Sequence, residues 1–240
     1  MFRRLALLAV FAAAPAAAQI VTDRPDLTES PVAVQRLQLE TGVVLTLEDT
    51  GLGGGSVDVA GPSALVRLPL APGVEARLGL PDVVVTDIGG AGQSLVGDPT
   101  VGVKAELPAP AGWGLAAIAE VSLPLGDDDA SGPASPLVIL IAGRDAGALG
   151  LGGQAEVAWD RATDRVEVGG TAVVGFPLAG PLGGFAEAAA GTTPDGVAAL
   201  VQTGVTLLLS PDLQFDAHLG AGLTDAAPDI VGGVGVSVRW

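Results

Sequence analysis

The polarity of the side chains alternates from one residue to the next between residues 35 and 48. One set of alternating positions is mostly apolar, as at Leu39 and Leu45, whereas the other set includes Glu40 and Glu48. Because successive side chains of a β-strand point to opposite faces, this segment would have one apolar face and one polar face. The pattern recurs about a dozen times along the chain, which is typical of a fold built from many two-faced strands.

Residues 1–18 have the features of an export signal. Arg3 and Arg4 form a basic start, residues 5–14 are apolar, and small residues up to Ala18 form a cleavage site. The apolar run is too short to span a membrane as a helix, and no later stretch offers about 18 uninterrupted apolar residues. We therefore expect cleavage near Ala18 and a mature protein beyond the inner membrane.

The composition excludes several classes of protein. Apolar residues make up 49% of the chain, too many for a disordered protein despite the net charge of −16. The absence of Cys excludes disulfides and thiolate chemistry, and a single His leaves little for metal binding. The acidic charge argues against nucleic-acid binding. We expect no cofactor, no metal site, no enzymatic activity and a single folded domain.

Apolar alternation between turn signals predicts twelve strands. The predicted strands are residues 35–48, 62–70, 74–81, 99–107, 114–124, 136–144, 147–159, 165–176, 182–192, 196–209, 213–222 and 229–240. Their number is even, and long links such as 49–61 and 82–98 alternate with short ones such as 71–73. In outer-membrane barrels, the short turns are periplasmic and the long loops lie outside.

The export signal and the repeated alternation together predict an all-β fold, a twelve-stranded antiparallel transmembrane β-barrel of the Gram-negative outer membrane. Residues 1–18 would be the signal peptide, residues 19–34 a periplasmic or plug segment, and residues 35–240 the barrel. Lipid would contact the apolar face of the strands. Residues 136–144 are the exception, because they are apolar at both sets of positions and indicate either a buried strand or a shifted register.

Charged and polar side chains of the predicted strands fall on the face opposite the apolar set, where they would line the pore. The predicted pore-lining residues are Arg36, Glu40, Arg67, Glu75, Arg77, Lys104, Glu106, Glu120, Glu156, Glu167, Glu187, Asp216, His218 and Arg239. Arg144, Glu48 and Asp160 extend this set. Such charges could filter solutes by sign and size, or they could form salt bridges that fill a narrow lumen.

The stretch before the first strand carries four charged residues and two prolines. Pro25 and Pro31 argue against a ladder strand here. We expect this stretch either to fold into the lumen as a plug, with Arg24 pairing inward carboxylates, or to hang as a loose periplasmic tail. The predicted plug residues are Asp23, Arg24, Asp26 and Glu29.

The predicted outer loops are acidic, as in the run from Asp127 to Asp129. They would repel anionic lipid headgroups, so we expect weakly bound Ca²⁺ or Mg²⁺; the alternative is that these loops are simply solvated. Position twelve counted from Asp127 is Val138, so the run is not an EF-hand. His218 has no GxSxG elbow to accompany it, which favours a lumen-lining role over hydrolysis.

Several segments resemble the outer-membrane transporter family named for the meta-pathway of phenol degradation. The stretch TDRPDLTESPVAVQRLQLETGV at residues 22–43 is similar to the start of that family, and GDPTVGVKAEL at 97–107, VSLPLG at 121–126 and PDLQFDAHLGAGL at 211–223 are similar to later parts. The resemblance implies an outer-membrane channel for hydrophobic or aromatic solutes. The absence of Tyr departs from the family pattern and argues against a path based on aromatic stacking.

We therefore expect a passive channel through which small, hydrophobic or aromatic solutes enter. The alternatives are a non-conducting surface barrel with a structural or adhesive role, and a soluble exported β-sandwich.

Overall fold

The computed structural model describes residues 20–49, 55–88 and 91–240. Fourteen strands form a single sheet in these ranges. They are β1 (Gln38–Asp49), β2 (Gly55–Ala71), β3 (Val74–Leu80), β4 (Val83–Ile88), β5 (Ala91–Val96), β6 (Thr100–Leu107), β7 (Gly114–Ser122), β8 (Pro136–Ala146), β9 (Leu149–Asp160), β10 (Arg165–Ala179), β11 (Leu182–Thr193), β12 (Gly196–Ser210), β13 (Leu213–Gly222) and β14 (Ile230–Arg239). Within these ranges, no helix is long and apolar enough to span a membrane.

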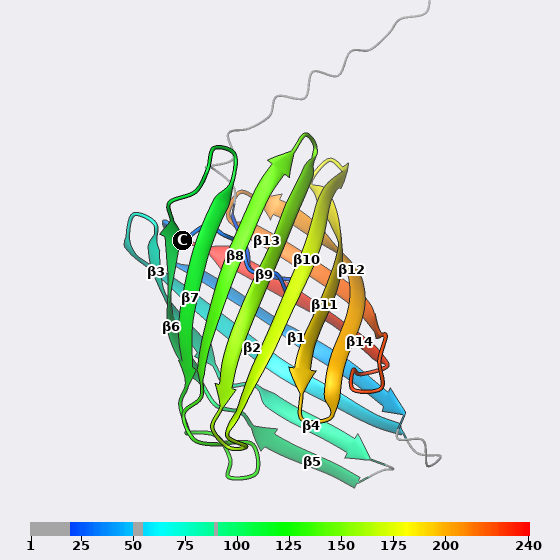
Figure 1. Ribbon diagram of the computed structural model, residues 1–240. Helices are drawn as coiled ribbons and strands as arrows, with labels where there is room; N and C mark the ends of the chain where they lie inside the picture. The colour runs from blue at the N-terminus through cyan, green and yellow to red at the C-terminus, as the bar shows by residue number, and fades with distance from the viewer. Residues whose placement is uncertain (1–19, 50–54, 89–90) are drawn as a thin grey trace, which may run out of the picture.

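Twelve of the strands close into an antiparallel barrel (Figure 1). β1 pairs with β2 on one edge and with β14 on the other, so the first and last strands meet. β3 pairs directly with β6, and the remaining neighbours follow the order of the chain. The predicted fold class is confirmed. The alternative of a β-sandwich is wrong, because one sheet closes on itself.

The hairpin formed by β4 and β5 lies outside this ring of twelve. Residues 56–60 of β2 pair with β4, whereas residues 64–71 of β2 pair with β3. The expectation of plain loops at residues 49–61 and 82–98 was therefore wrong. Val57 and Val59 continue the alternation of β2 past Gly61, where a register shift against β1 keeps the strand paired. Figure 1 shows the hairpin at the end opposite the C-terminus.

The two faces of the barrel differ in polarity as the alternation predicts. Large apolar side chains such as Leu45, Val205 and Val234 are exposed on the outer face, whereas charged side chains lie inside. A Lys or Arg on the lipid-facing surface costs about 2–4 kcal/mol at the midplane of a bilayer, which favours this distribution.

Residues 136–144 belong to a regular barrel strand, β8, whose inner face is apolar. Ile139 and Ile141 are buried against Ala116 and Ile118 of β7. Val138 and Leu140 take the outer face and are exposed. The absence of alternation in this segment thus reflects an apolar patch on the inner wall of the barrel.

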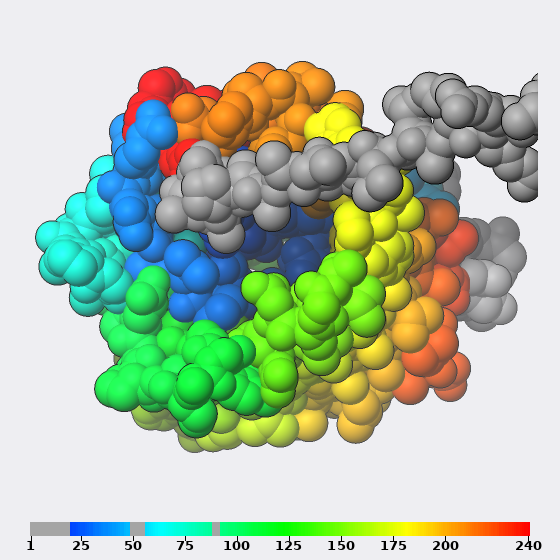
Figure 2. All heavy atoms as spheres, turned by 90° about the horizontal axis from the view of Figure 1, so that it is seen from above, coloured from blue at the N-terminus to red at the C-terminus, as the bar shows by residue number. Residues whose placement is uncertain are grey.

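Most of residues 20–37 lie inside the barrel. Figure 2 looks along the barrel from the end that carries the C-terminus and shows these dark-blue residues within the ring of strands. The amide of Ile20 donates a hydrogen bond to the carbonyl of Pro211, and the amide of Trp240 donates to Leu37. Both ends of the described chain therefore lie at the same end of the barrel, called here the terminal end. Residues 20–37 are called the N-terminal segment.

Candidate functional site: the occupied lumen

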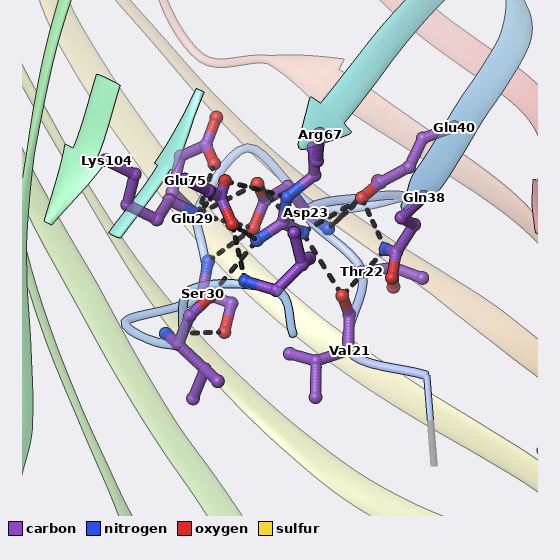
Figure 3. Close-up of polar contacts among 12 residues, drawn as sticks. Val21, Thr22, Asp23, Glu29, Ser30, Gln38, Glu40, Arg67, Glu75 and Lys104 are labelled. Carbon is purple, nitrogen blue, oxygen red and sulfur yellow. Dashed lines mark hydrogen bonds and ion pairs between the residues drawn. The ribbon is translucent and has the colours of Figure 1, made fainter. Parts of the chain in front are cut away.

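The first anchor of the N-terminal segment is an ion-pair cluster around Asp23 (Figure 3). Both carboxylate oxygens of Asp23 lie 2.9 Å from Nζ of Lys104 on β6. Arg77 on β3 donates to Asp23 at 2.6 Å, and Arg67 on β2 lies 3.1 Å away. The amide of Ser30 also donates to Asp23, at 3.0 Å. One carboxylate of the segment thus binds cations from three strands.

Carboxylates of the wall complete this cluster from the other side. Glu75 on β3 accepts two hydrogen bonds from Arg67, at 2.9 and 3.0 Å, and a third from the amide of Val34 at 2.6 Å. Glu40 on β1 accepts from Arg67 at 3.0 Å and from the amide of Asp23 at 3.0 Å. The wall therefore binds the backbone of the segment as well as its side chains.

Glu29 is the second carboxylate that the segment brings to the cluster. It lies 2.8 Å from Arg77 and 3.3 Å from Lys104. Burial and the charge of nearby Asp23 raise the pKa of Glu29 to about 8. Burial also acts to raise the pKa of Asp23, but the attraction of Arg67, Lys104 and Arg77 outweighs it and holds that pKa well below its usual range. Asp23 is therefore the permanent anion of the cluster.

A second anchor lies on the opposite wall at Glu187 of β11. Its carboxylate accepts hydrogen bonds from the amides of Leu27 and Thr28, both at 2.8 Å, and from the Thr28 hydroxyl. Gln202 on β12 donates to the same carboxylate. The amide of Glu29 donates to Gln154 on β9 at 2.8 Å. These contacts fix the middle of the segment between two walls of the barrel.

Arg24 forms the third anchor, beside the seam where the barrel closes. Its guanidinium lies 3.3 Å from Asp216 of β13, whose side chain is fully buried. Gly42 of β1 and Gly235 of β14 pair with each other, and a Cβ at either would lie within 2.6 Å of Arg24. The absence of side chains at these two positions provides the space that the guanidinium occupies.

A cavity remains beside the N-terminal segment on the β7–β10 side. Its volume is about 570 Å³, and Figure 2 shows a hollow at this end of the barrel. Much of its wall is glycine backbone, contributed by Gly114, Gly143, Gly150, Gly152 and Gly175. A Cβ at Gly143 would lie 3.2 Å from Pro31, whereas a Cβ at Gly150 would meet nothing within 4 Å. Some of these glycines therefore admit the segment, and others leave open space.

The structure places most of the predicted pore-lining residues on the inner face of the barrel. These are Glu40, Arg67, Glu75, Arg77, Lys104, Glu106, Glu120, Glu156, Glu167, Glu187, Asp216 and His218. Several of these wall residues contact the predicted plug residues Asp23, Arg24 and Glu29 at the three anchors. The fourth predicted plug residue, Asp26, lines the cavity. Their influence on solute passage stays a prediction.

Two predicted cations lie away from the inner face, and a third lies on that face at the rim. Arg36 precedes β1, is half-exposed and binds Asp212 at 2.8 Å. Arg239 ends β14 on the inner face, opposite Gln38, and binds the same carboxylate at 2.7 Å at the rim of the terminal end. Arg144 shares its face of the sheet with Leu151, its partner on β9, and lies 5.2 Å from the Trp113 ring centroid. Arg144 differs from the expected lumen lining because the inward positions of β8 are those of Ile139 and Ile141, and Arg36 differs because it precedes the first strand.

Uncharged polar residues that bind the segment were not among the predicted site residues. Gln38 is fully buried and donates to the carbonyl of Val21 and to Glu40, both at 2.8 Å. Gln214 donates to the Thr22 hydroxyl at 2.9 Å. Their inward position in the alternation was a usable signal. Within the described ranges, no group of three or more His, Asp or Glu residues is placed to hold a metal ion. The binding of Ca²⁺ or Mg²⁺ between the acidic loops and lipid headgroups stays a prediction.

The match to known families agrees with the geometry. A family model described as the MetA-pathway of phenol degradation matches residues 22–240. The chain belongs to this family. The predicted resemblance is thereby confirmed over residues 22–240. No curated protein sequence matches the chain.

Solved outer-membrane proteins share the fold of this family member at low sequence identity. An outer-membrane channel from Pseudomonas putida F1 is 12% identical, with a TM-score of 0.72, over 92% of this chain and 100% of that one. The KdgM porin in complex with oligogalacturonate is 8% identical, with a TM-score of 0.58, over 85% and 99%. The translocator domain of the autotransporter NalP from Neisseria meningitidis is 13% identical, with a TM-score of 0.56, over 86% and 89%. The fold is that of outer-membrane barrels.

Proposed function

We propose that this protein is a passive channel of the outer membrane for small solutes, and that its N-terminal segment constricts the lumen. The observation that carries the proposal is the placement of the segment, which is anchored on β1, β2, β3 and β6 by the Asp23 cluster and on β11 by Glu187. A segment that contacts facing walls narrows any path through the barrel to the space left beside it.

The chemistry of the inner wall supports a path for solutes. Charged side chains such as Glu156 and Glu167 face the lumen. In porins, whose fold this barrel shares, a polar lumen of this kind is filled with water. The cavity beside the segment has both apolar walls and polar groups, so we propose that small solutes with an apolar part can pass. Oligogalacturonate is the ligand in the solved complex of the KdgM porin, and a shared fold at 8% identity does not transfer it to this chain.

The second candidate is a non-conducting structural barrel, favoured by the depth of the Asp23 cluster. Arg67, Lys104, Glu40 and Glu75 are fully buried, as expected of ion pairs that fill a closed lumen. Single-channel recording in planar bilayers separates the two candidates. The full mature chain should conduct, and deletion of residues 22–30 should raise the conductance of each open channel.

Two outcomes would count against the proposal. Absence of conductance in both proteins would favour the structural role, provided that both show the heat-modifiable gel mobility of a folded barrel. Equal conductance of the two proteins would leave the channel but remove the constriction by the segment.

A further inference from the structure

The cavity at the terminal end contains a carboxyl group that no cation of the described chain engages. Asp26 lines this cavity, between the Asp23 and Glu187 anchors. Among the described residues, none donates a side-chain hydrogen bond to the Asp26 carboxyl or forms an ion pair with it. Arg77 and Lys104 are already bound to Asp23 and Glu29, and Arg144, which also lines the cavity, lies over the Trp113 ring.

The charges around Asp26 are of its own sign. Burial raises the pKa of Asp26, and the negative charges of Glu187, Asp23 and Glu40 raise it further. The donors near Glu187 do not serve Asp26, because the amides of Leu27 and Thr28 and the side chain of Gln202 donate to the Glu187 carboxylate. A carboxyl group in such surroundings gains from a neighbouring cation, which the described part of the chain does not supply.

Part of the cavity wall is apolar or bare backbone, and the other lining residues are polar: Thr22, Thr28, Glu29, Ser30, Arg144 and Asp145. Val173 and Phe185 face it from β10 and β11, and Pro31 and Val32 face it from the segment. Gly150 has open space where a side chain would be. The volume of about 570 Å³ lies within the range of pockets that bury small ligands, and such pockets combine apolar walls with a small number of polar groups.

We infer that this cavity binds a small apolar solute that carries a cationic amine, with the ammonium group on Asp26 and the apolar body against Val173 and Phe185. The inference rests on the proposed function, since it names the class of solute that would bind in the cavity while passing through the channel. The ammonium group would supply the cation that Asp26 lacks, and it would displace the proton that Asp26 holds at neutral pH because its pKa is raised to about 8. The glycine wall admits a flat apolar body.

Isothermal titration calorimetry on the purified full-length barrel in detergent micelles tests the inference with three probes of one shape: benzylamine, benzyl alcohol and benzoate. Benzylamine should bind most tightly and benzoate should not bind. Asp26→Asn, which keeps the shape of the side chain, should weaken benzylamine binding by about tenfold or more and change benzyl alcohol little. Asp195→Asn, at the opposite end of the lumen, is the matched control and should bind as the wild type does.

Gly150→Leu tests the place of binding, because its side chain would fill the open space in the cavity. This variant should lose binding of both benzylamine and benzyl alcohol. Any heat that remains in its titration measures uptake of the probe by the micelle. Unchanged benzylamine binding in Asp26→Asn, or binding that persists in a folded Gly150→Leu barrel, would overturn the inference. So would the absence of benzylamine binding to the wild type. Conductance is measured separately, so a failure here is distinguishable from a failure of the channel.

Discussion

The ammonium group of Lys104 lies 2.9 Å from each carboxylate oxygen of Asp23, and neither side chain is accessible to solvent to any significant extent. Lys104 belongs to the wall and Asp23 to the N-terminal segment, so this contact joins the two parts of the molecule. Removing one partner from a buried ion pair leaves the other charge uncompensated, at a cost of about 3–5 kcal/mol. The position of the segment should therefore depend strongly on Asp23.

Asp23→Ala should detach the segment from the wall, because Arg67, Arg77 and Lys104 would all lose the same partner. We expect the single-channel conductance to rise toward that of the protein without residues 22–30. Asp212→Ala is the control, since it breaks only the pairs with Arg36 and Arg239 at the rim. Wild-type conductance in Asp23→Ala would show that other contacts suffice to hold the segment.

Two glycines of the same inner wall should respond differently to substitution. Gly143→Val would bring a branched side chain against Pro31, whereas Gly150→Val extends into open space. Hydrogen exchange of the amides of Thr28 and Ala33 measures the effect, because both amides donate to wall carboxylates. Exchange should accelerate in Gly143→Val and stay near the wild-type rate in Gly150→Val. Equal rates in the two variants would contradict the docking described for Pro31.

Segment docking should weaken as the pH rises from about 4 to about 8. Burial, followed by the charge of Glu187, raises the pKa of Asp26 to about 8, and that of Glu29, beside Asp23, Arg77 and Lys104, is raised to about 8. A carboxyl group with a raised pKa holds its proton more tightly in the docked state, so docking loses free energy as the pH rises through this range.

Asp26→Asn and Glu29→Gln together should flatten the pH dependence of conductance. The lowered pKa of Asp23 acts in the other direction, but only below its ordinary pKa of about 4, where its protonation removes an anchor. Conductance of the wild type that falls between about pH 5 and pH 8 would have the wrong sign for this account.

Adjacent residues of β1 test which face meets lipid. Leu45 is exposed on the outer face, and Thr46 points inward opposite Asp58 of β2, whose Oδ1 is buried without a partner in the described chain. Leu45→Arg should destabilise the barrel by up to about 2–4 kcal/mol. Thr46→Arg should cost less, because its guanidinium can bind Asp58. Urea unfolding in lipid vesicles, followed by tryptophan fluorescence, should rank the variants in this order; equal stability would contradict the assignment of faces.

Alternation predicted the strands of the barrel because a period of two is imposed at every residue by the difference between lipid and water. The same rule placed Arg67, Arg77 and Lys104 on the inner face before any contact was known. It could not find the β4–β5 hairpin, whose short strands interrupt a stretch that looks like a loop. It also left β8 ambiguous, because Ile139 and Ile141 are apolar residues that face the lumen.

The path of the N-terminal segment was not predictable in the same way. Its irregular backbone has no period, so the sequence was compatible with a plug or a loose tail. Its anchors depend on contacts between distant residues, such as Thr28 with Glu187, for which a single sequence carries no local signal. The sequence showed a high glycine content but not that glycines line the cavity. The roles of Gly143, which makes room for Pro31, and of Gly150, which leaves open space, follow only from the position of the segment.

The segment is continuous with β1, and only a few residues separate Val34, which binds Glu75, from Gln38, where the strand begins. A detached segment would thus remain tethered at the mouth, at an effective concentration that short linkers typically hold in the millimolar range. Rebinding would be unimolecular, so each molecule would open and close independently of its neighbours and of the amount of protein in the membrane.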